Sequence, residues 1–307
     1  MKFCVDDLIE QGLVKKKTYT TGEFEGLSVL KYSKKVFYNN LWNKDKRLLD
    51  CRGMVVDSEN NIVVWPFTKV FNLYENNTKV DRNKIVIAPR KINGFMCAVS
   101  VYNGKPIYST TGSLDSEFAK MAREVIEGQM FKDEQFEGER TYLFEICHPN
   151  DPHIVEEEFG AYLIGVRKHS SGKMMSEYTL NVIADATGFY RPSLTVGKFS
   201  DILEESKSCK HEGFMIIDHQ TGETLCKLKS NHYLSKKAIM RLGSSKVEDM
   251  FDNPEKFKQR IDEEFYSITD FIVKTVDKEQ WKSYNDQQRR TFIEKYFRGC
   301  HENSITG

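Results

Sequence analysis

The sequence lacks an excess of charge of either sign, because its 307 residues contain 45 Lys and Arg against 45 Asp and Glu. This balance excludes the simplest composition argument for nucleic-acid binding, so such a function must depend on local groups of residues. Hydrophobic residues make up 39% of the chain and charged residues 29%, as in folded globular proteins. At roughly 100–200 residues per domain, the length predicts two domains.

The sequence also lacks paired cysteines and long apolar runs. No C-x-x-C pair occurs, which excludes a zinc ribbon and a thioredoxin motif, and scattered thiols fit a reducing compartment. No apolar run approaches the roughly 18–20 residues of a membrane helix, and MKFCVDDLIE has acids where a signal peptide is apolar. We expect a soluble cytoplasmic protein (host cytoplasm if viral) with no membrane or obligate protein partner. The seven cysteines are Cys4, Cys51, Cys97, Cys147, Cys209, Cys226 and Cys300.

Short β-type segments with turn signals between them occupy about the first 240 residues. Asn103-Gly104 is a strong signal for a type I′ hairpin turn. Segments joined by such tight turns form antiparallel sheets, so the predicted class is α+β and not a doubly wound parallel sheet. The predicted hairpins are 54–57 with 62–65, 97–102 with 106–110, and 214–218 with 224–229; further strands are 84–88, 141–147 and 161–167.

Helical periodicity appears once within this region and then dominates the end of the chain. Residues 113–127 place Leu114, Phe118, Met121 and Val125 on one face of a helix. Near Gly243 the character changes to helices, and Asn253-Pro254 supplies an N-cap and a first-turn proline. The sequence predicts a domain at 1–242 and an all-helical domain at 243–307. Its helices are one through Phe257, Ile261, Phe265, Ile268 and Ile272 and another at about 278–297.

Short motifs with chemically useful side chains follow one another in a fixed order. Each alone has a simpler explanation: a solvated lysine before a turn, a strand acid in an ion pair, or two solvent-facing lysines on an alternating strand. Their joint order, at strand ends and on strand faces, favours a shared site. The motifs are Arg52-Gly53, residues 66–72, the K-x-[DN]-G tetrapeptide Lys91-Ile-Asn-Gly94, Phe144-Glu145, His211-Glu212-Gly213 and Lys227-Leu-Lys229.

The chemistry of these residues is coherent around Lys91. A lysine attacks an electrophile only after it loses its proton, which nearby cations and a bound divalent metal favour. Lys227 and Lys229 share one face of a strand, because strand side chains have a period of two. Both can therefore reach the phosphates of a purine nucleotide and offset the charge that develops there. The pattern predicts attack by Lys91 on an α-phosphate.

Two carboxylates and two glycines complete the pattern. Glu145 and Glu212 suit ribose hydroxyls and a hard metal such as Mg²⁺. Gly94 and Gly213 allow a ligand to approach the backbone closely. The pattern therefore includes groups for the sugar and the metal of a bound nucleotide.

These motifs resemble those of the covalent nucleotidyltransferases, which include DNA ligases, RNA ligases and mRNA capping enzymes. The motif I to V equivalents are Lys91-Ile-Asn-Gly94, Phe144-Glu145, Tyr162-Leu-Ile-Gly-Val-Arg167, Glu212-Gly213 and Lys227-Leu-Lys229. Over about residues 25–240 the chain resembles the phage T4 RNA ligase 1 group in particular. That likeness is carried by Cys51-Arg-Gly53, Lys69-Val-Phe-Asn-Leu73, Phe144-Glu-Ile-Cys-His-Pro149, His153-Ile-Val155 and Lys229-Ser-Asn-His-Tyr233.

The resemblance implies an antiparallel-sheet nucleotidyltransferase (ATP-grasp-like ligase) domain and an RNA-repair ligase. It implies ATP as AMP donor, Mg²⁺ or Mn²⁺ as metal, and RNA ends, single-stranded or broken tRNA-like, as partners. Lys91 would carry the AMP, with Lys229 and Glu212 also catalytic, Glu145 and Glu212 at the metal, and Tyr233 supporting end joining. The residues implied to contact ATP are Tyr32, Arg52, Lys69, Phe71, Gly94, Glu145, Lys227 and Lys229.

Two departures and two alternatives qualify this prediction. Asn93 stands where many relatives have Asp, and the tail is shorter than in the phage T4 protein. A DNA ligase or capping-type enzyme is one alternative. Either is expected to carry an OB-type domain after Lys229, where this sequence predicts helices instead. A catalytically inactive RNA-end-binding protein is the other.

The helical tail itself has two interpretations. It is either a solvated helix pair that covers the sheet, or an RNA-holding surface made by Arg289 and Arg290 with Trp281 and Tyr284 for stacking.

Overall fold

The structure is a computed structural model that describes residues 1–132, 134–151, 153–241, 244–261 and 265–302. The chain divides into two compact units, Met1–Val70 with Ile92–Ser193 and Phe71–Lys91 with Leu194–Gly307. Strand pairing within the three described sheets is antiparallel throughout. The α+β class is thereby confirmed.

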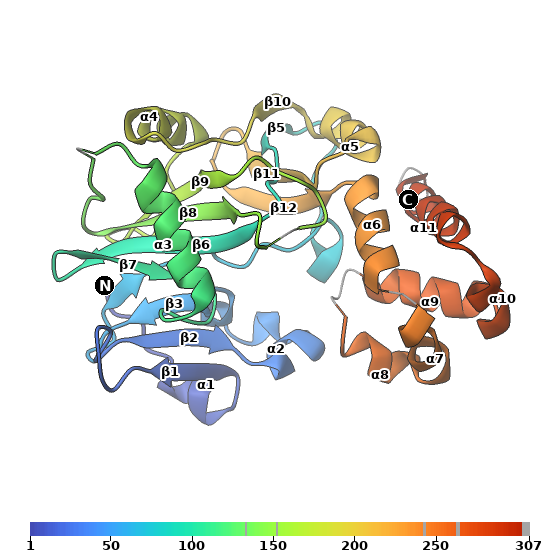
Figure 1. The fold of residues 1–307 in the computed structure, drawn as a ribbon, viewed down its shortest axis with the longest axis horizontal. Helices are drawn as coiled ribbons and strands as arrows, with labels where there is room; N and C mark the ends of the chain where they lie inside the picture. Colours follow the sequence, from blue (N-terminus) through green and yellow to red (C-terminus); the bar gives the residue numbers. More distant parts are fainter. Residues whose placement is uncertain (133, 152, 242–243, 262–264, 303–307) are drawn as a thin grey trace. The chain divides into compact units, whose positions relative to one another are not determined.

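The first unit contains two four-stranded sheets, with strand orders β1-β2-β3-β4 and β7-β6-β8-β9 (Figure 1). Its strands are β1 Val14–Thr18, β2 Ser28–Tyr32, β3 Arg52–Val56, β4 Ile62–Val64, β6 Phe95–Tyr102, β7 Lys105–Ser109, β8 Arg140–Cys147 and β9 Gly160–Lys168. Its helices are α1 Asp6–Glu10, α2 Lys34–Tyr38, the 3₁₀ turns η1 Trp42–Lys44 and η2 Lys46–Leu49, α3 Glu117–Gln129 and α4 Glu177–Thr187.

The core of the first unit has three layers, because both faces of the β7-β6-β8-β9 sheet are buried. On one face Phe144 packs with Ile126 of α3 and Leu180 of α4. On the other face Leu143 packs with Val55 of the β1–β4 sheet. The side chains of β8 therefore alternate between two cores, as the strand period of two requires.

The predicted hairpins are present with small changes of boundary. β3 pairs with β4 and β6 pairs with β7, joined by Asn103 (φ 50°) and Gly104 (φ 73°). Positive φ at both central residues is what a type I′ turn needs. The predicted hairpin at 214–229 is also present, in the second unit.

The helix predicted at 113–127 begins later than expected. α3 starts at Glu117, and the Ser116 hydroxyl accepts a hydrogen bond from the Ala119 N–H at 3.2 Å. Residues before Ser116 instead form a turn, in which Leu114 N–H donates to the Tyr19 hydroxyl. One residue of the predicted apolar face, Phe118, is 45% exposed. The buried residues of α3 are Ala119, Ala122, Val125 and Ile126.

The second unit combines one sheet, of order β10-β5-β11-β12, with most of the helices. Phe199 and Ile202 of α5 pack on this sheet against Val86, Phe214 and Leu228. Its strands are β5 Ile85–Pro89, β10 Leu194–Lys198, β11 Gly213–Asp218 and β12 Thr224–Lys229. Its helices are η3 Glu75–Asn77, α5 Phe199–Ser208, α6 Asn231–Arg241, α7 Ser244–Asp252, α8 Pro254–Lys258, α9 Tyr266–Thr275, α10 Lys278–Ser283 and α11 Asp286–Glu302.

The tail helices are shorter and more numerous than predicted. The predicted Asn253 cap is present, since its side chain accepts from the Lys256 N–H. The chain then turns at 259–260 before α9 begins at Tyr266, and residues 262–264 lie outside the described part. The apolar residues nevertheless share one core, as their spacing predicted: Phe257, Ile261, Phe265, Ile268 and Ile272.

The helix predicted at about 278–297 is interrupted by a capping box. Asn285 and Gln288 each donate a backbone N–H to the other's side-chain oxygen, both at 2.9 Å. This reciprocal pair starts a new helix, so α10 ends at Ser283 and α11 begins at Asp286.

The domain division at residue 242 stays a prediction. Residues 242 and 243 lie outside the described part of the chain. The helical core already includes Ala238 of α6, which begins at Asn231.

Two further observations concern the chain as a whole. In the described ranges, no helix is long and apolar enough to span a membrane. Six cysteines whose side chains are described are free thiols: Cys4, Cys51, Cys97, Cys147, Cys209 and Cys226.

Candidate active site

Lys91 lies against the start of β11 in the second unit. Its backbone N–H donates to the Gly213 carbonyl at 2.8 Å, which fixes the lysine beside the preceding residue, Glu212. The Lys91 Nζ lies 3.1 Å from the Glu212 Oε2. Glu212 is only 3% exposed, and a buried carboxylate requires such a partner.

The neighbouring strand β12 brings a second lysine to the same carboxylate. Lys229 lies opposite Gly213 in the register of β11 and β12, and its Nζ is 4.0 Å from the Glu212 Oε1. Lys227 and Lys229 are partly exposed, whereas the intervening Leu228 is buried. This alternation confirms that the two lysines share one face of β12.

Phe71 also lies beside β12. The Lys227 N–H donates to the Phe71 carbonyl at 2.8 Å, and the Leu73 N–H donates to the Lys227 carbonyl at 2.9 Å. Asn72 and Lys227 thus form a parallel bridge. The second unit therefore gathers Lys91, Glu212, Lys227, Lys229 and Phe71, five of the predicted site residues, around the paired ends of β11 and β12.

The turn from β12 into α6 supports this group. The Ser230 N–H donates to the Glu212 carbonyl at 2.8 Å, and the Ser230 hydroxyl donates to the His211 carbonyl at 2.6 Å. Tyr233 is buried, with the Lys229 Nζ 5.0 Å from its ring centroid and the Lys237 Nζ 5.5 Å from it. Cation–π contacts of this kind restrict the position of Lys229.

In the first unit, Gly94 and Glu145 contact each other directly. The Gly94 N–H donates to the Glu145 Oε1 at 3.1 Å, and Glu145 is 8% exposed. A Cβ on residue 94 would lie 2.2 Å from the Ile146 carbonyl oxygen. Glycine is therefore needed here for close packing against β8, a reason that the tetrapeptide pattern did not reveal.

An aromatic and cationic group forms around Lys69. The Lys69 Nζ lies 4.5 Å from the Trp42 ring centroid and 5.9 Å from that of Phe37. The rings of Tyr32 and Trp42 pack edge to face, with their centroids 4.8 Å apart. Two residues that are predicted to contact the nucleotide, Tyr32 and Lys69, thus both pack against the Trp42 ring. The sequence analysis missed Trp42, because no sequence motif marks the 3₁₀ turn on which it lies.

Arg52 and Lys69 are carried by two segments that a buried arginine holds together. The Arg167 guanidinium donates to the Pro66 carbonyl at 2.6 Å and to the Thr68 hydroxyl at 3.0 Å. Thr68 in turn donates to the Asp50 Oδ1 at 2.6 Å. Burial lowers the pKa of Arg167, although its guanidinium stays charged. Asp50 was not predicted, and its place two residues before Arg52 is its only sequence signal.

No three His, Cys, Asp or Glu side chains cluster as a metal site in the described residues. The two predicted metal ligands belong to different units, Glu145 to the first and Glu212 to the second. The chain passes between the units at Val70–Phe71, Lys91–Ile92 and Ser193–Leu194. Lys91 is therefore the last residue of its segment in the second unit.

The proposed stacking role of Trp281 is wrong. Trp281 is fully buried in the helical core. Arg289 donates to the Trp281 carbonyl at 3.4 Å and to the Lys282 carbonyl at 3.3 Å, a common role for a cation at a helix C-terminus. These contacts of Arg289 stabilise the end of α10.

Gly213→Ala is expected to destabilise the strand pair that carries the site. Gly213 has φ +132°, and a Cβ there would lie 2.0 Å from the Leu228 carbonyl oxygen. We expect a loss of roughly 1–3 kcal/mol in the free energy of unfolding, measured by urea denaturation. Gly197→Ala in the same sheet is the control, because a Cβ there meets nothing within 4 Å. Equal effects of the two changes would contradict this assignment.

A family model described as RNA ligase, of the T4 RNA ligase 1 type, matches residues 50–267, which is more than half of the chain. The chain belongs to this RNA ligase family. The match includes the β11–β12 group and Lys91, and the lysyl-AMP route to ATP-dependent RNA joining is typical of the family. No curated protein matched the chain.

The fold of this RNA ligase is similar to that of solved ligases. An archaeal ATP-dependent RNA ligase (form 2) matches with a TM-score of 0.58 and 13% identity, over 95% of this chain and 76% of that chain. A putative ATP-dependent DNA ligase from Aquifex aeolicus matches with a TM-score of 0.57 and 13% identity, over 94% of this chain and 74% of that chain. At this identity the likeness shows the nucleotidyltransferase-type ligase fold alone.

Proposed function

We propose that this RNA ligase adenylates Lys91 with ATP and joins 5′-phosphate to 3′-hydroxyl RNA ends. The observation that carries the proposal is the position of Lys91, 3.1 Å from the buried Glu212, with Lys229 4.0 Å from the same carboxylate. A potential nucleophile, a cation and a carboxylate that can accept a proton therefore lie together. The ion pair with this carboxylate holds the lysine in place.

The proposed reaction has three transfers at phosphorus. Lys91 Nζ loses a proton and attacks the α-phosphorus of ATP, forming a P–N bond while pyrophosphate leaves. An oxygen of the RNA 5′-phosphate then attacks that phosphorus, and the P–N bond breaks while the leaving nitrogen takes up protons from water, which regenerates the lysine. The RNA 3′-hydroxyl finally attacks the 5′-phosphorus, loses its proton, and AMP leaves. Lys229 and Lys227 would offset charge on the phosphate oxygens.

The residues fit a divalent metal, with Mg²⁺ or Mn²⁺ as the candidates. Mg²⁺ is usually held by one or two carboxylates, water and substrate phosphates, and so needs no dedicated cage. Glu212 would be one such ligand and Glu145 a second. Glu212 faces the ammonium groups of Lys91 and Lys229, and these positive charges oppose a metal cation at the same carboxylate. When Lys91 loses its proton and becomes the form that attacks, one of these charges is gone and metal binding is favoured. The metal would supply charge neutralisation to the phosphates.

The other predicted residues would hold the nucleotide. Lys69 and Arg52 would contact its phosphates, and Tyr32 and Phe71 would line the base site. The Gly94 N–H already orients Glu145, a carboxylate of the kind that suits a ribose hydroxyl. Arg167 and Asp50 would position Lys69 and Arg52 through the Thr68 hydrogen bonds described above.

The substrates and setting follow the family. We propose RNA ends as substrates, in repair of broken strands, and a reducing cytoplasmic compartment that is consistent with the six free thiols. We also propose a nucleotidyltransferase domain at 1–242 and a helical domain at 243–307. The Lys91 chemistry would not require side chains of that second domain.

Lys69→Gln is expected to raise the KM for ATP in self-adenylation about tenfold, since a charge-assisted contact contributes on the order of 1.5 kcal/mol. The measurement is the initial rate of labelling over a range of ATP concentrations. Lys105→Gln removes the same charge from an exposed position on β7 and should leave KM unchanged. If Lys69→Gln alters only the maximal rate, Lys69 does not hold ground-state ATP.

Two assays on the wild-type chain test the proposed function. Incubation with α-labelled ATP and a divalent metal, followed by denaturing electrophoresis, should label the protein. A 5′-phosphorylated RNA should then be joined to a 3′-hydroxyl end. Failure of labelling would overturn the proposed adenylation. Labelling without joining of any RNA would overturn the proposal that RNA ends are the substrate.

A further inference from the structure

Three cations lie in a row across β1, β2 and β3, the first three strands of the β1–β4 sheet. Lys15 of β1 lies directly opposite Lys31 of β2, and Lys31 lies opposite Arg52 of β3. Residues directly opposite in neighbouring strands project from the same face. All three side chains are exposed, so one face of this sheet, within the first unit, presents an unbroken row of positive charge.

A β-bulge brings Arg52 into the row. The register of β2 and β3 shifts between Leu30 and Lys31, because Gly53 has no partner there. Without this shift, Arg52 would project from the opposite face, with Met54. Gly53 has φ +89°, and a Cβ there would lie 2.8 Å from the Thr111 Cα. Bulges re-aim side chains in this way and are frequent near active sites.

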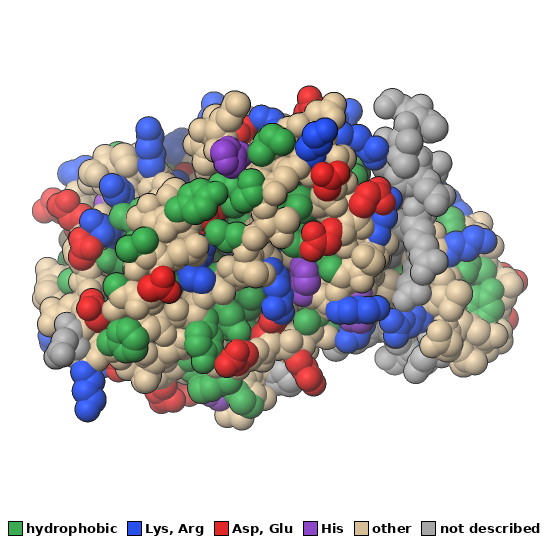
Figure 2. Space-filling view, turned by 90° about the horizontal axis from the view of Figure 1, so that it is seen from above, with side chains coloured by type: hydrophobic (Ala, Val, Ile, Leu, Met, Phe, Trp, Pro, Cys, Tyr) green, Lys and Arg blue, Asp and Glu red, His purple; other side chains and the backbone are tan. Residues whose placement is uncertain are grey.

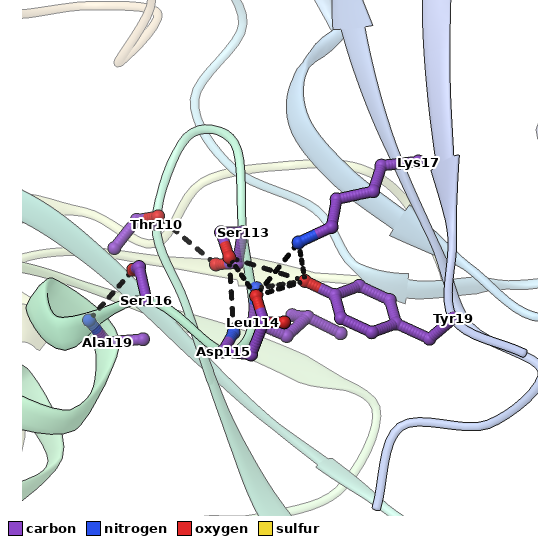
Figure 3. A network of polar contacts seen from close by, with 8 residues as sticks. All are labelled: Lys17, Tyr19, Thr110, Ser113, Leu114, Asp115, Ser116 and Ala119. Atoms are coloured by element: carbon purple, nitrogen blue, oxygen red, sulfur yellow. Dashed lines mark hydrogen bonds and ion pairs between the residues drawn. The ribbon is translucent and has the colours of Figure 1, made fainter. Parts of the chain in front are cut away.

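Among the described residues, nothing neutralises the three cations of the row. Lys15, Lys31 and Arg52 make no ion pair and no side-chain hydrogen bond in the described part of the chain. Lys17, two residues after Lys15 on the same face, differs: its Nζ lies 2.9 Å from the Asp115 Oδ1 and 2.9 Å from the Tyr19 hydroxyl (Figure 3). This face of β1 therefore carries one neutralised lysine, Lys17, and one that is left for another anion, Lys15.

Like charges directly opposite each other destabilise a sheet. Lysines on an edge strand protect it from pairing with another chain, which explains Lys15 on β1. That explanation does not extend to Lys31 and Arg52, because β2 and β3 are interior strands. A bound polyanion explains all three.

We propose that Lys31 and Lys15 bind backbone phosphates of the RNA substrate, on a path that leads across the sheet from Arg52. The row extends two strand spacings, about 10 Å. The proposed nucleotide site already has Arg52, Lys69, Lys227 and Lys229 for one triphosphate, so the added cations suit the longer anion. Figure 2 shows one face of the molecule, on which the basic and acidic side chains of the described residues are interspersed. Attraction of RNA would therefore depend on a local row of cations and not on a general excess of positive charge.

This inference rests on the proposed function, since it takes RNA as the substrate. The test is binding of a 5′-phosphorylated, fluorescently labelled RNA strand, measured by anisotropy across a salt series. The variant is Lys15→Gln with Lys31→Gln. Its control is Lys16→Gln with Lys105→Gln, which removes the same charge from exposed positions, Lys16 being on the opposite face of β1.

The row variant should bind RNA more weakly than wild type at low salt. Its plot of log affinity against log salt should be shallower by about 1.4, from roughly 0.7 per phosphate on a single strand. Its melting temperature should be preserved, because the change relieves like-charge repulsion in the sheet. Its ATP-dependent self-adenylation should be preserved as well. The control should bind as wild type does.

Two results would overturn the proposal that the row binds RNA. One is RNA affinity and salt slope equal to those of the control, and the other is a raised KM for ATP with unchanged RNA binding, which would assign the row to the nucleotide. If wild type itself fails to bind RNA, the proposed substrate fails instead. The two failures are therefore distinguishable.

Discussion

Lys91→Ala is expected to abolish ATP-dependent RNA joining and covalent labelling of the protein by α-labelled ATP. The reason is that Lys91 stands in the K-x-[DN]-G tetrapeptide and its Nζ lies 3.1 Å from the buried Glu212, closer than the Lys229 Nζ at 4.0 Å. The same variant should still join RNA that already carries AMP on its 5′ end. That last transfer uses the RNA 3′-hydroxyl as nucleophile and needs no lysyl adduct.

The two halves of this result separate chemistry from folding. A variant that had failed to fold would lose both reactions, whereas loss of the first alone assigns Lys91 to the adenylation step. Lys210→Ala, an exposed lysine just before His211, is the control and should retain both. Labelling of Lys91→Ala at the wild-type level would mean that another residue is the nucleophile.

Lys229→Ala is expected to lower the maximal rate of self-adenylation by roughly 10²–10³-fold, the range for removing one donor aimed at developing negative charge. The KM for ATP should change much less, because the interaction strengthens in the transition state. Single-turnover labelling at several ATP concentrations separates the two constants. The buried surroundings of Glu212 and Tyr233 make this charge more effective than an exposed one.

Loss of a partner for Glu212 is the competing explanation for a Lys229 effect. Lys198→Ala, in β10 of the same sheet and exposed, controls for general loss of charge, and thermal melting reports on folding. If Lys229→Ala raises KM alone, its charge serves ground-state binding. If its melting temperature falls steeply, the lysine is chiefly a structural partner of the buried carboxylate.

Much of this fold followed from local sequence signals. Alternating segments and the Asn103-Gly104 turn predicted strand pairs that the structure contains, because a strand's period and a type I′ turn are properties of a few adjacent residues. The pairing of Lys227 and Lys229 on one face followed for the same reason. Helix boundaries were less predictable: α3 begins at Glu117 because the preceding turn is held by Tyr19, which is distant in sequence.

Other features of the site depend on contacts that no local pattern contains. The cation–π contact of Trp42 with Lys69 joins a 3₁₀ turn to a loop. The links from Arg167 through Thr68 to Asp50 join three segments. The capping box at Asn285 was readable in the sequence, but the apolar periodicity on either side of it suggested a continuous helix. Roles for Tyr32, Arg52 and Lys69 came from family resemblance and stay predictions, as does the role of Glu145.

Mapping the AMP adduct by mass spectrometry tests the central claim most directly. The wild-type chain would be incubated with ATP and Mg²⁺, digested under conditions that spare an acid-labile phosphoramidate bond, and its peptides sequenced by fragmentation. We expect one AMP per chain, attached to Lys91. AMP on any other residue, or no adduct in a preparation that joins RNA, would contradict it.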